Sequence, residues 1–368
     1  MYFCRTKQYT KMSNNYTSNL HIEKAKTSKI NTVDFDNLTF GRTFTDHMFI
    51  CDFVDGKWQQ PKIMPYQAMT MDPSARVFHY GQAVFEGMKA YKDDKGDVFL
   101  FRPDQNFKRI NKSCARLAMP EFPENYFFDG LTTLVNLDRD WVKPGMGNSL
   151  YLRPFAIAID SAIAAAPSDS YRFMIICSPA KAYYKGTVKV LIAEEFSRSA
   201  NGGVGFAKAA GNYAAQFYPT SLAQKKGYQQ VIWTDADTHT FLEEAGTMNV
   251  FFRINDTLIT APISDRILDG VTRKSLIQLA EDNNIPIEVR QIKVSEIVEA
   301  SKNGTLQEIF GAGTAAVISP IEGFEYKDTY YELPQIEDHS YSSILKNKMM
   351  SIQHNLSEDK NGWRYEVK

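Results

Sequence analysis

The tract NGGVGFAKAAGNY at residues 201–213 carries several glycines and one lysine, Lys208, just before a segment expected to be helical. Small neighbours let a ligand approach the backbone closely. Two phosphate motifs do not fit, because a P-loop needs G-x-x-x-x-G-K-[ST] and a dinucleotide fingerprint needs G-x-G-x-x-G directly after a strand. A lysine beside glycines is often only a solvated loop residue; the functional interpretation is a partly desolvated amine suited to Schiff-base chemistry. The tract alone leaves both open.

Three more clusters with possible chemistry lie downstream. FLEEAGTMNV at residues 241–250 places Glu244 and Thr247 before an apolar strand, although in isolation a hairpin turn with solvated carboxylates also explains it. FGAGTAA at residues 310–316 is either a strand end shaped for packing or a nest of backbone N–H groups for phosphate or carboxylate. DGVT at residues 269–272 begins an expected helix whose free N–H groups suit an anion, although every helix has such an end.

The first half of the chain adds two arginines and an aromatic segment. Arg109 lies in NFKRI, Arg153 in YLRP, and FHYGQAVFEGMKA at residues 78–90 contains Tyr80 and Phe85. An arginine in an apolar strand pattern, as at Arg153, must reach solvent or meet an anion. The two aromatics could equally be core residues. The six histidines form neither a close pair nor an HExxH motif, so metal-dependent hydrolysis has no support.

Composition indicates a folded protein of two domains. The chain has 368 residues, at ~100–200 residues per domain, and its 42 Lys+Arg against 43 Asp+Glu make nucleic acid and anionic membranes poor partners. Its four cysteines are widely spaced, which argues against zinc sites and disulfides and favours a cytosol. Runs of about 18 apolar residues, as in a membrane span, are missing.

Hydrophobic spacing predicts helices and strands in both halves, an α+β fold without a regular βαβ rhythm. The expected strands are residues 49–58 (a hairpin over Asp55-Gly56), 98–102, 149–159, 171–178, 188–194, 229–234, 250–261 (a second hairpin), 285–292 and 308–310. The expected helices are residues 107–117, 131–141, 212–226, 271–283 and 295–302. The expected organisation is a polar, disordered tail at residues 1–35, a smaller N-terminal domain at 36–178, an interdomain loop at 179–187 and a larger domain at 188–368. A native start at Met12, or a targeting role for the tail, stays open.

Seven segments, in this order and spacing, resemble the fold-type IV pyridoxal-phosphate aminotransferases, specifically the long-form branched-chain amino-acid aminotransferases. They are FHYGQAVFEGMKAY, LFRPDQNFKRI, SLYLRP, GGVGFAKAAGNYAAQ, LEEAGTMNVFF, ILDGVTRKSLI and EIFGAGTAAVISP. Each is weak alone, but the resemblance runs from about Phe40 to Pro334, which argues against coincidence. It implies two α/β domains joined by a loop, with pyridoxal 5'-phosphate held by the larger one.

The resemblance also implies roles for individual residues. Lys208 would be the catalytic lysine that binds the cofactor covalently. Tyr213 would bind the cofactor's phenolate oxygen, Glu244 its pyridine nitrogen, and Arg109, Val271, Thr272 and Thr314 its phosphate. The substrate carboxylate would meet Tyr80, Thr247 and the amide of Ala315. Phe85, Tyr151 and Tyr183 would line the side-chain pocket, and Arg153 would receive the second carboxylate of glutamate or 2-oxoglutarate.

The implied activity is a ping-pong transfer of the amino group of leucine, isoleucine or valine to 2-oxoglutarate, by a cytoplasmic homodimer that binds neither nucleic acid nor membrane. D-amino-acid transaminases and aminodeoxychorismate lyases of this fold are the alternatives, and a non-catalytic phosphate-ligand binding protein is a more distant one. The sequence departs from mammalian relatives, which carry a C-x-x-C pair where this chain has Ala316-Val-Ile-Ser319. Thiol regulation at that position is therefore excluded.

Overall fold

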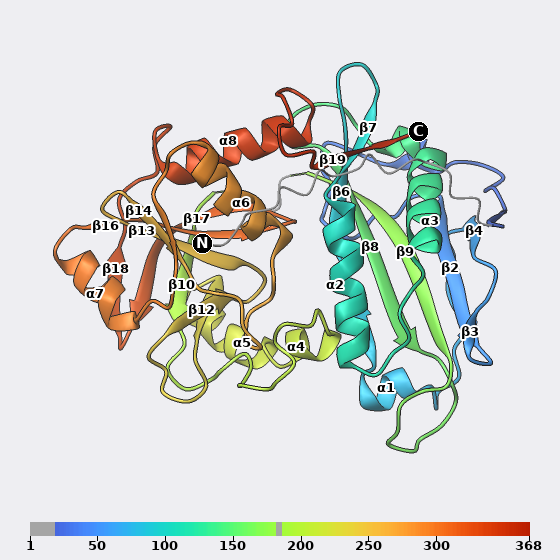
Figure 1. Ribbon diagram of the computed structural model, residues 1–368, viewed down its shortest axis with the longest axis horizontal. Coiled ribbons are helices and arrows are strands. Elements are labelled where there is room, and N and C mark those ends of the chain that lie inside the picture. The colour runs from blue at the N-terminus through green and yellow to red at the C-terminus, as the bar shows by residue number, and fades with distance from the viewer. Residues whose placement is uncertain (1–18, 182–185) are drawn as a thin grey trace, which may run out of the picture.

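Two β-sheets, one in each half of the molecule in Figure 1, organise the chain, of which the computed structural model describes residues 19–181 and 186–368. Both sheets carry helices, so the chain has the mixed α and β content that the sequence predicted. Among the described helices, none is long and apolar enough to cross a membrane.

The first sheet has ten strands, and its neighbours run antiparallel except for the parallel pair β1 and β4. In spatial order the strands are β1 (His21–Ile22), β4 (Lys62–Pro65), β2 (His47–Val54), β9 (Tyr171–Ala180), β8 (Ser149–Ala158), β6 (Met88–Lys92), β7 (Val98–Phe101) and β19 (Arg364–Val367), with β3 (Lys57–Trp58) on β2 and β5 (Ala83–Phe85) on β8. The β2–β3 hairpin turns at Asp55 and Gly56, where both residues have positive φ as a two-residue turn requires.

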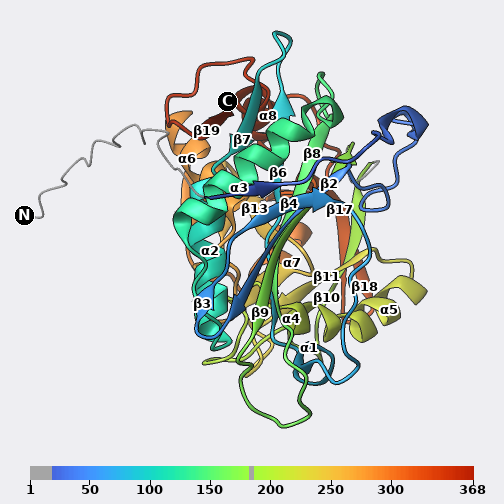
Figure 2. The same cartoon turned by 90° about the vertical axis from the view of Figure 1, so that its right-hand side faces the viewer.

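Two long helices cover this sheet, α2 (Pro103–Arg116) and α3 (Glu124–Leu137), and the short α1 (Arg76–Tyr80) lies near one end (Figure 2). Two 3-10 turns, Ile30–Thr32 and Arg139–Trp141, complete this half. Helix α2 buries Asn106, Arg109, Ile110 and Ser113 at helical spacing. Its buried face therefore mixes core residues with polar residues that reach the site described below.

The second sheet has nine strands of mixed direction. In spatial order they are β12 (Leu242–Ala245), β11 (Gln230–Thr234), β10 (Val188–Ile192), β17 (Val317–Tyr326), β16 (Leu306–Gly313), β13 (Asn249–Ile254), β14 (Thr257–Thr260) and β15 (Ile287–Val289), with β18 (Thr329–Glu332) on β17. β12 also pairs with β13, so that six strands form a closed ring of hydrogen-bonded neighbours.

Helices pack on both faces of the second sheet, because strand side chains alternate between two cores. Phe252 lies in the core that includes α7 (Val294–Lys302), whereas its neighbour Phe251 lies in the core that includes α6 (Val271–Asp282) and α8 (Tyr341–Gln353). The remaining helices are the short α4 (Ala210–Ala214) and α5 (Phe217–Lys225). The helix expected at 212–226 is thus interrupted, and Pro219 is one cause because it has no N–H to donate to the carbonyl of residue 215.

The structure corrects the expected disordered tail. Its first eighteen residues lie outside the described part, but residues 19–35 are folded against the first sheet. Ser28 and the amide of Lys29 both donate hydrogen bonds to the carboxylate of Asp46, at 2.5 and 2.9 Å. Apolar residues of the segment, including Phe35, pack against the first core. The polar composition concealed these anchors because they are spaced without a helical or strand period.

The chain also returns to the first sheet at its end, where β19 pairs antiparallel with β7. The second domain expected at residues 188–368 therefore does not account for β19, since strand pairing depends on contacts between distant segments. The loop expected at 179–187 overlaps β9, which continues to Ala180. The division into two domains otherwise stays a prediction.

Candidate active site

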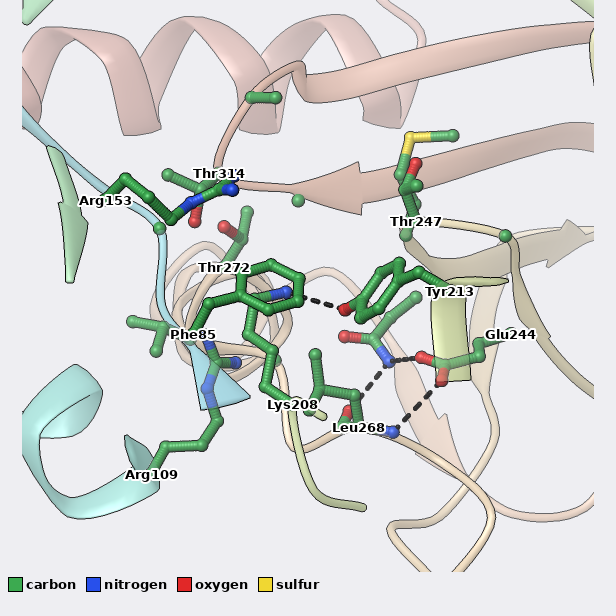
Figure 3. Close-up of a pocket in the computed structure, with 18 of the residues that line it drawn as sticks. Phe85, Arg109, Arg153, Lys208, Tyr213, Glu244, Thr247, Leu268, Thr272 and Thr314 are labelled. Carbon is green, nitrogen blue, oxygen red and sulfur yellow. Dashed lines mark hydrogen bonds between the residues drawn. The ribbon is translucent and has the colours of Figure 1, made fainter. Parts of the chain in front are cut away.

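A cavity of about 640 Å³ lies between the two halves and collects residues from both. The first sheet and α2 contribute Phe85, Arg109, Tyr151 and Arg153, and the second half contributes most of the remaining lining. Figure 3 shows Arg109, Thr272 and Thr314 on one side and Glu244 on the other, with Lys208, Phe85 and Tyr213 between them. The cavity thus has a cationic end and an acidic end with an amine in the middle.

Two hydrogen bonds fix the backbone of Lys208. Its amide donates to the hydroxyl of Ser113 on α2 at 2.9 Å, and its carbonyl accepts from the amide of Phe85 at 3.0 Å. The ammonium lies 2.8 Å from the hydroxyl of Tyr213 and 4.7 Å from the centre of the Phe85 ring. A tyrosine oxygen and two aromatic faces therefore surround the amine, which points into the cavity instead of solvent.

The glycine tract before Lys208 follows a path that side chains would block. A Cβ on Gly205 would lie 2.6 Å from the carbonyl oxygen of Arg266. Asn212 closes the tract by donating its side-chain amide to the carbonyls of Val204 and Ala207, at 2.9 and 2.8 Å. The small residues before Lys208 thus allow the backbone of the tract to pack closely against neighbouring segments.

Glu244 forms the acidic end of the cavity and is buried. Its carboxylate accepts from Arg198 Nη1 at 2.8 Å, from the amide of Leu268 at 3.2 Å and from the side-chain amide of Asn249 at 3.0 Å. Burial raises the pKa of Glu244 above its usual value, and the charges of Arg198 and Lys208 only partly offset that effect. A hydrogen-bond donor or cation placed against this carboxylate would stabilise its charged form.

Arg109 forms part of the cationic end and is paired with the fully buried Glu86. Two of its nitrogens contact the two carboxylate oxygens at 2.6 and 2.8 Å, and a third donates to the carbonyl of Asp269 at 2.9 Å. Burial would raise the pKa of Glu86, but the charge and hydrogen bonds of Arg109 outweigh it and lower the pKa. The guanidinium is thus locked in one orientation with its remaining N–H groups available to the cavity.

The other expected phosphate ligands line the same cavity. Val271 and Thr272 begin α6 after Gly270, and no described side chain caps this helix end. Thr314 lies in the turn between β16 and β17. Backbone N–H groups at a helix N-terminus, a guanidinium and two threonines form a donor set suited to a phosphate dianion.

The expected substrate ligands are brought together only in part. Phe85, Tyr151, Arg153, Thr247 and Ala315 line the cavity. Arg153 donates to the hydroxyl of Tyr151 at 3.1 Å, lies 4.7 Å from the centre of the Phe85 ring, and has a buried Nε without a hydrogen-bond partner. The strand arginine therefore faces the cavity, where an anion could bind.

Two expected substrate residues are not placed in the cavity. Tyr80 lies on α1, is 44% exposed, and donates to the carbonyl of Ile163 instead. Tyr80 is thus not among the lining residues of this chain's cavity, and its role as a substrate ligand stays a prediction. Tyr183 lies outside the described residues.

Sequence reasoning missed the partners of the expected residues, namely Glu86, Ser113, Arg198 and Asn249. Glu86 carried a usable signal, because an acid in the apolar run AVFEGM requires a buried partner. Arg198 lies in a loop without periodicity, and its pairing with Glu244 depends on how that loop folds. Nothing local would have indicated it.

The residues fit a pyridoxal phosphate. Such a group needs donors for its phosphate, a carboxylate near its ring nitrogen and an amine between them, and Arg109, Glu244 and Lys208 supply these types in that order across the cavity (Figure 3). A family model described as amino-transferase class IV matches residues 83–324. A branched-chain-amino-acid transaminase from Bacillus subtilis is 48% identical over 78% of this chain and 82% of its own length.

The chain belongs to the class IV aminotransferases. A probable branched-chain-amino-acid aminotransferase of Staphylococcus epidermidis is 46% identical to it over 91% of this chain and 94% of the relative. Among solved structures, a branched-chain aminotransferase from Thermobaculum terrenum in its PLP form matches with a TM-score of 0.70 at 20% identity, covering 87% of this chain and 98% of that one. The aminotransferase thus has the fold-type IV architecture that its motifs predicted.

Proposed function

We propose that this aminotransferase moves the amino group of a branched-chain L-amino acid to 2-oxoglutarate, with pyridoxal 5'-phosphate bound in the large cavity. The observation that carries the proposal is the placement of Lys208 between the buried Glu244 and the phosphate-type donors at Arg109 and α6. The names of the relatives, branched-chain-amino-acid transaminases at 46–48% identity, support the substrate class.

The cofactor would be held at three points. Arg109, Thr314 and the N-terminus of α6 bind its phosphate, Tyr213 its phenolate oxygen and Glu244 its pyridine nitrogen. When bound, pyridoxal phosphate withdraws electrons from the substrate Cα. The protonated ring nitrogen would supply the cation that the buried carboxylate of Glu244 lacks on its cavity side.

Lys208 would bind the cofactor covalently until the substrate amine takes its place, and the freed lysine amine would then move the proton at the substrate Cα. The Tyr213 hydroxyl, 2.8 Å from Nζ, keeps the amine within the cavity between Phe85 and the cofactor position. A general base must lie within hydrogen-bond reach of the proton it takes. The backbone contacts to Ser113 and Phe85 fix the position from which the lysine can swing.

Substrate choice depends on one pocket with two uses. Thr247 and the amide of Ala315 bind the substrate carboxylate, while Phe85 and Tyr151 provide apolar walls for a branched side chain. Because one methylene in such a pocket changes discrimination by only ~1–3 kcal/mol, leucine, isoleucine and valine should all react. Arg153 then donates hydrogen bonds to the second carboxylate of 2-oxoglutarate, and its unpartnered Nε supports this role.

The proposal includes a homodimer. Around α1 the chain exposes large apolar side chains, with Phe78 61% and Ile163 72% exposed beside Tyr80. An exposed apolar patch of this kind is typical of an interface. Tyr183 of the interdomain loop is proposed to line the side-chain pocket. We place the protein in the cytoplasm, which suits the free, buried thiols of Cys51, Cys114 and Cys177.

A substrate panel with purified protein tests the proposal. We expect the cofactor's absorbance band at neutral pH and amine transfer from L-leucine to 2-oxoglutarate, with D-alanine inactive. Lys208→Ala should abolish transfer while Lys112→Ala, at a surface lysine of α2, retains it. Transfer from D-alanine would indicate the D-amino-acid transaminase, pyruvate release from aminodeoxychorismate the lyase, and cofactor binding without any turnover the non-catalytic protein. An active Lys208→Ala variant would contradict the assignment of the lysine.

A further inference from the structure

A second cavity, of about 260 Å³, lies behind the turn that closes the active site. Its walls come from β6, the beginning of β17 and the C-terminal half of α8, the helix that reaches across the top of Figure 1. Ala315 and Ala316 line both this cavity and the large one. A single turn of backbone therefore separates the two spaces.

Two lysines line the second cavity without forming an ion pair in the described part of the chain. Lys89 is 6% exposed and donates to the carbonyl of Ala315 at 2.8 Å. Burial lowers its pKa to about 8 and also lowers the pKa of Lys346 on α8. Burying an ammonium without a counter-charge is unfavourable, so both groups would gain from a nearby anion.

Three further polar groups in the lining have buried atoms without a hydrogen-bond partner. They are Ser319 Oγ, Gln353 Oε1 and His354 Nδ1, in side chains that are 1%, 5% and 3% exposed. Burial lowers the pKa of His354 to about 4, with the charge of Lys89 adding to the effect and Asp94 opposing it, so the imidazole is neutral. Buried polar atoms are normally satisfied, and of these three the Ser319 hydroxyl can donate a hydrogen bond to a ligand that only accepts.

We propose that the second cavity binds a small carboxylate, with its oxygens on the ammonium groups of Lys89 and Lys346 and on the hydroxyl of Ser319. A carboxylate accepts hydrogen bonds only, which suits these donors. The cavity faces the C-terminal end of α8, whose dipole is negative, and the described residues of its lining include no arginine. A singly charged ion is therefore favoured over a phosphate dianion. Met350 and Val317 offer apolar surface to a short hydrocarbon part.

Binding there would weaken substrate binding in the active site, a consequence that rests on the proposed function. Lys89 would turn from the Ala315 carbonyl to the ligand, and the Ala315 amide is the group proposed to bind the substrate carboxylate. The ligand would also place a second negative charge behind the same turn. Both effects lower the affinity for the substrate. By linkage, bound substrate must lower the affinity of the second cavity for the carboxylate by the same factor.

The probe for a test is 3,3,3-trifluoropropanoate, followed by fluorine NMR on the holoenzyme and on enzyme loaded with N-(5'-phosphopyridoxyl)-L-leucine, which fills the cofactor and substrate positions. We expect saturable binding that persists in the loaded enzyme. Lys346→Met should weaken it about tenfold, as loss of one charge-assisted hydrogen bond implies. Lys348→Met, at an exposed position on the same helix, is the matched control and should stay within about twofold.

The neutral trifluoropropanamide should not compete with the probe. In the wild type, saturating probe should lower the affinity for phosphopyridoxyl-leucine at least about threefold. In Lys346→Met the probe should leave that affinity unchanged. The proposal is overturned by equal probe binding in Lys346→Met and Lys348→Met, by no binding at all, or by equal displacement with the amide or with sulfate. If the phosphopyridoxyl adduct does not bind, the proposed function fails, whereas probe binding to the unloaded protein still reports on the second cavity.

Discussion

Arg198→Met removes the charge that balances Glu244 while keeping most of the apolar length of the side chain. Arg198 Nη1 lies 2.8 Å from Glu244 Oε1, and the two side chains are 2% and 5% exposed. The same nitrogen donates to the carbonyls of Gly205 and Arg266 at 3.1 and 2.7 Å. The substitution therefore leaves a buried carboxylate without its ion-pair partner and loosens the path of the glycine tract.

The expected loss is large, because removing one partner of a buried ion pair costs about 3–5 kcal/mol of unfolding free energy. The charge of Arg198 also lowers the pKa of Glu244 against the effect of burial, so that pKa should rise further in the variant. A protonated Glu244 could no longer keep the cofactor's ring nitrogen charged. Turnover should fall together with stability.

Urea unfolding of the cofactor-free protein measures the first effect, and a pH titration of the bound cofactor's absorbance measures the second. Glu244→Gln introduced into Arg198→Met should restore at least about 2 kcal/mol, because it replaces the uncompensated carboxylate with a neutral amide. The reasoning is refuted if Arg198→Met stays within about 1 kcal/mol of the wild type, or if Glu244→Gln restores nothing in that background.

Three further substitutions test the site and the packing of the two halves. Gly270→Ala places a Cβ 1.9 Å from Asn249 Oδ1, so it should displace the amide that orients Glu244 and weaken cofactor binding at least about tenfold in an equilibrium titration; unchanged affinity would contradict this. In Asp235, burial would raise the pKa, but hydrogen bonds from Thr238, Thr240 and Phe241 lower it to about 2. The ionised Asp235 carboxylate therefore stabilises the fold above its unfolded pKa, and this stabilisation is lost as the pH falls through about 2. Asp235→Asn should lower the unfolding free energy, measured in urea, by about 2 kcal/mol at pH 7 and by a smaller amount at pH 3. An equal loss at both pH values would refute the role of these hydrogen bonds. Gly130→Ala directs a Cβ to 2.3 Å from the buried Phe49 ring and should lower the unfolding free energy by about 1–3 kcal/mol with little change in KM, whereas a more stable variant would show that helix propensity outweighs the clash.

Many secondary-structure elements were predictable because their signals are local. The β2–β3 hairpin was expected from Asp55-Gly56, and α6 and α7 were expected within one residue of their observed bounds. β19 and the packing of residues 19–35 were not, since each depends on a distant strand or side chain. The interruption between α4 and α5 had a local signal in Pro219 that the expected helix overlooked.

The roles expected for the site residues stay predictions, but many of these residues line one cavity. Lys208, Glu244 and Arg109 each lie in a short segment with a recognisable pattern, and all three line one cavity. Tyr80 also lies in such a segment, but it is not in the cavity lining and donates to the carbonyl of Ile163. A motif specifies the local backbone, and it says nothing about which face of the molecule that backbone will join.

The sequence by itself determined the family and the lysine on which the proposed chemistry depends, because both are written in residues close together along the chain. The tertiary structure alone decided the partners. Glu86 meets Arg109 across 23 residues, and Lys89 meets Ala315 across 226. Burial of the core brings together segments that no local pattern connects, and their charges become paired there. The second cavity, with its unpartnered polar atoms, forms only when those segments pack against one another.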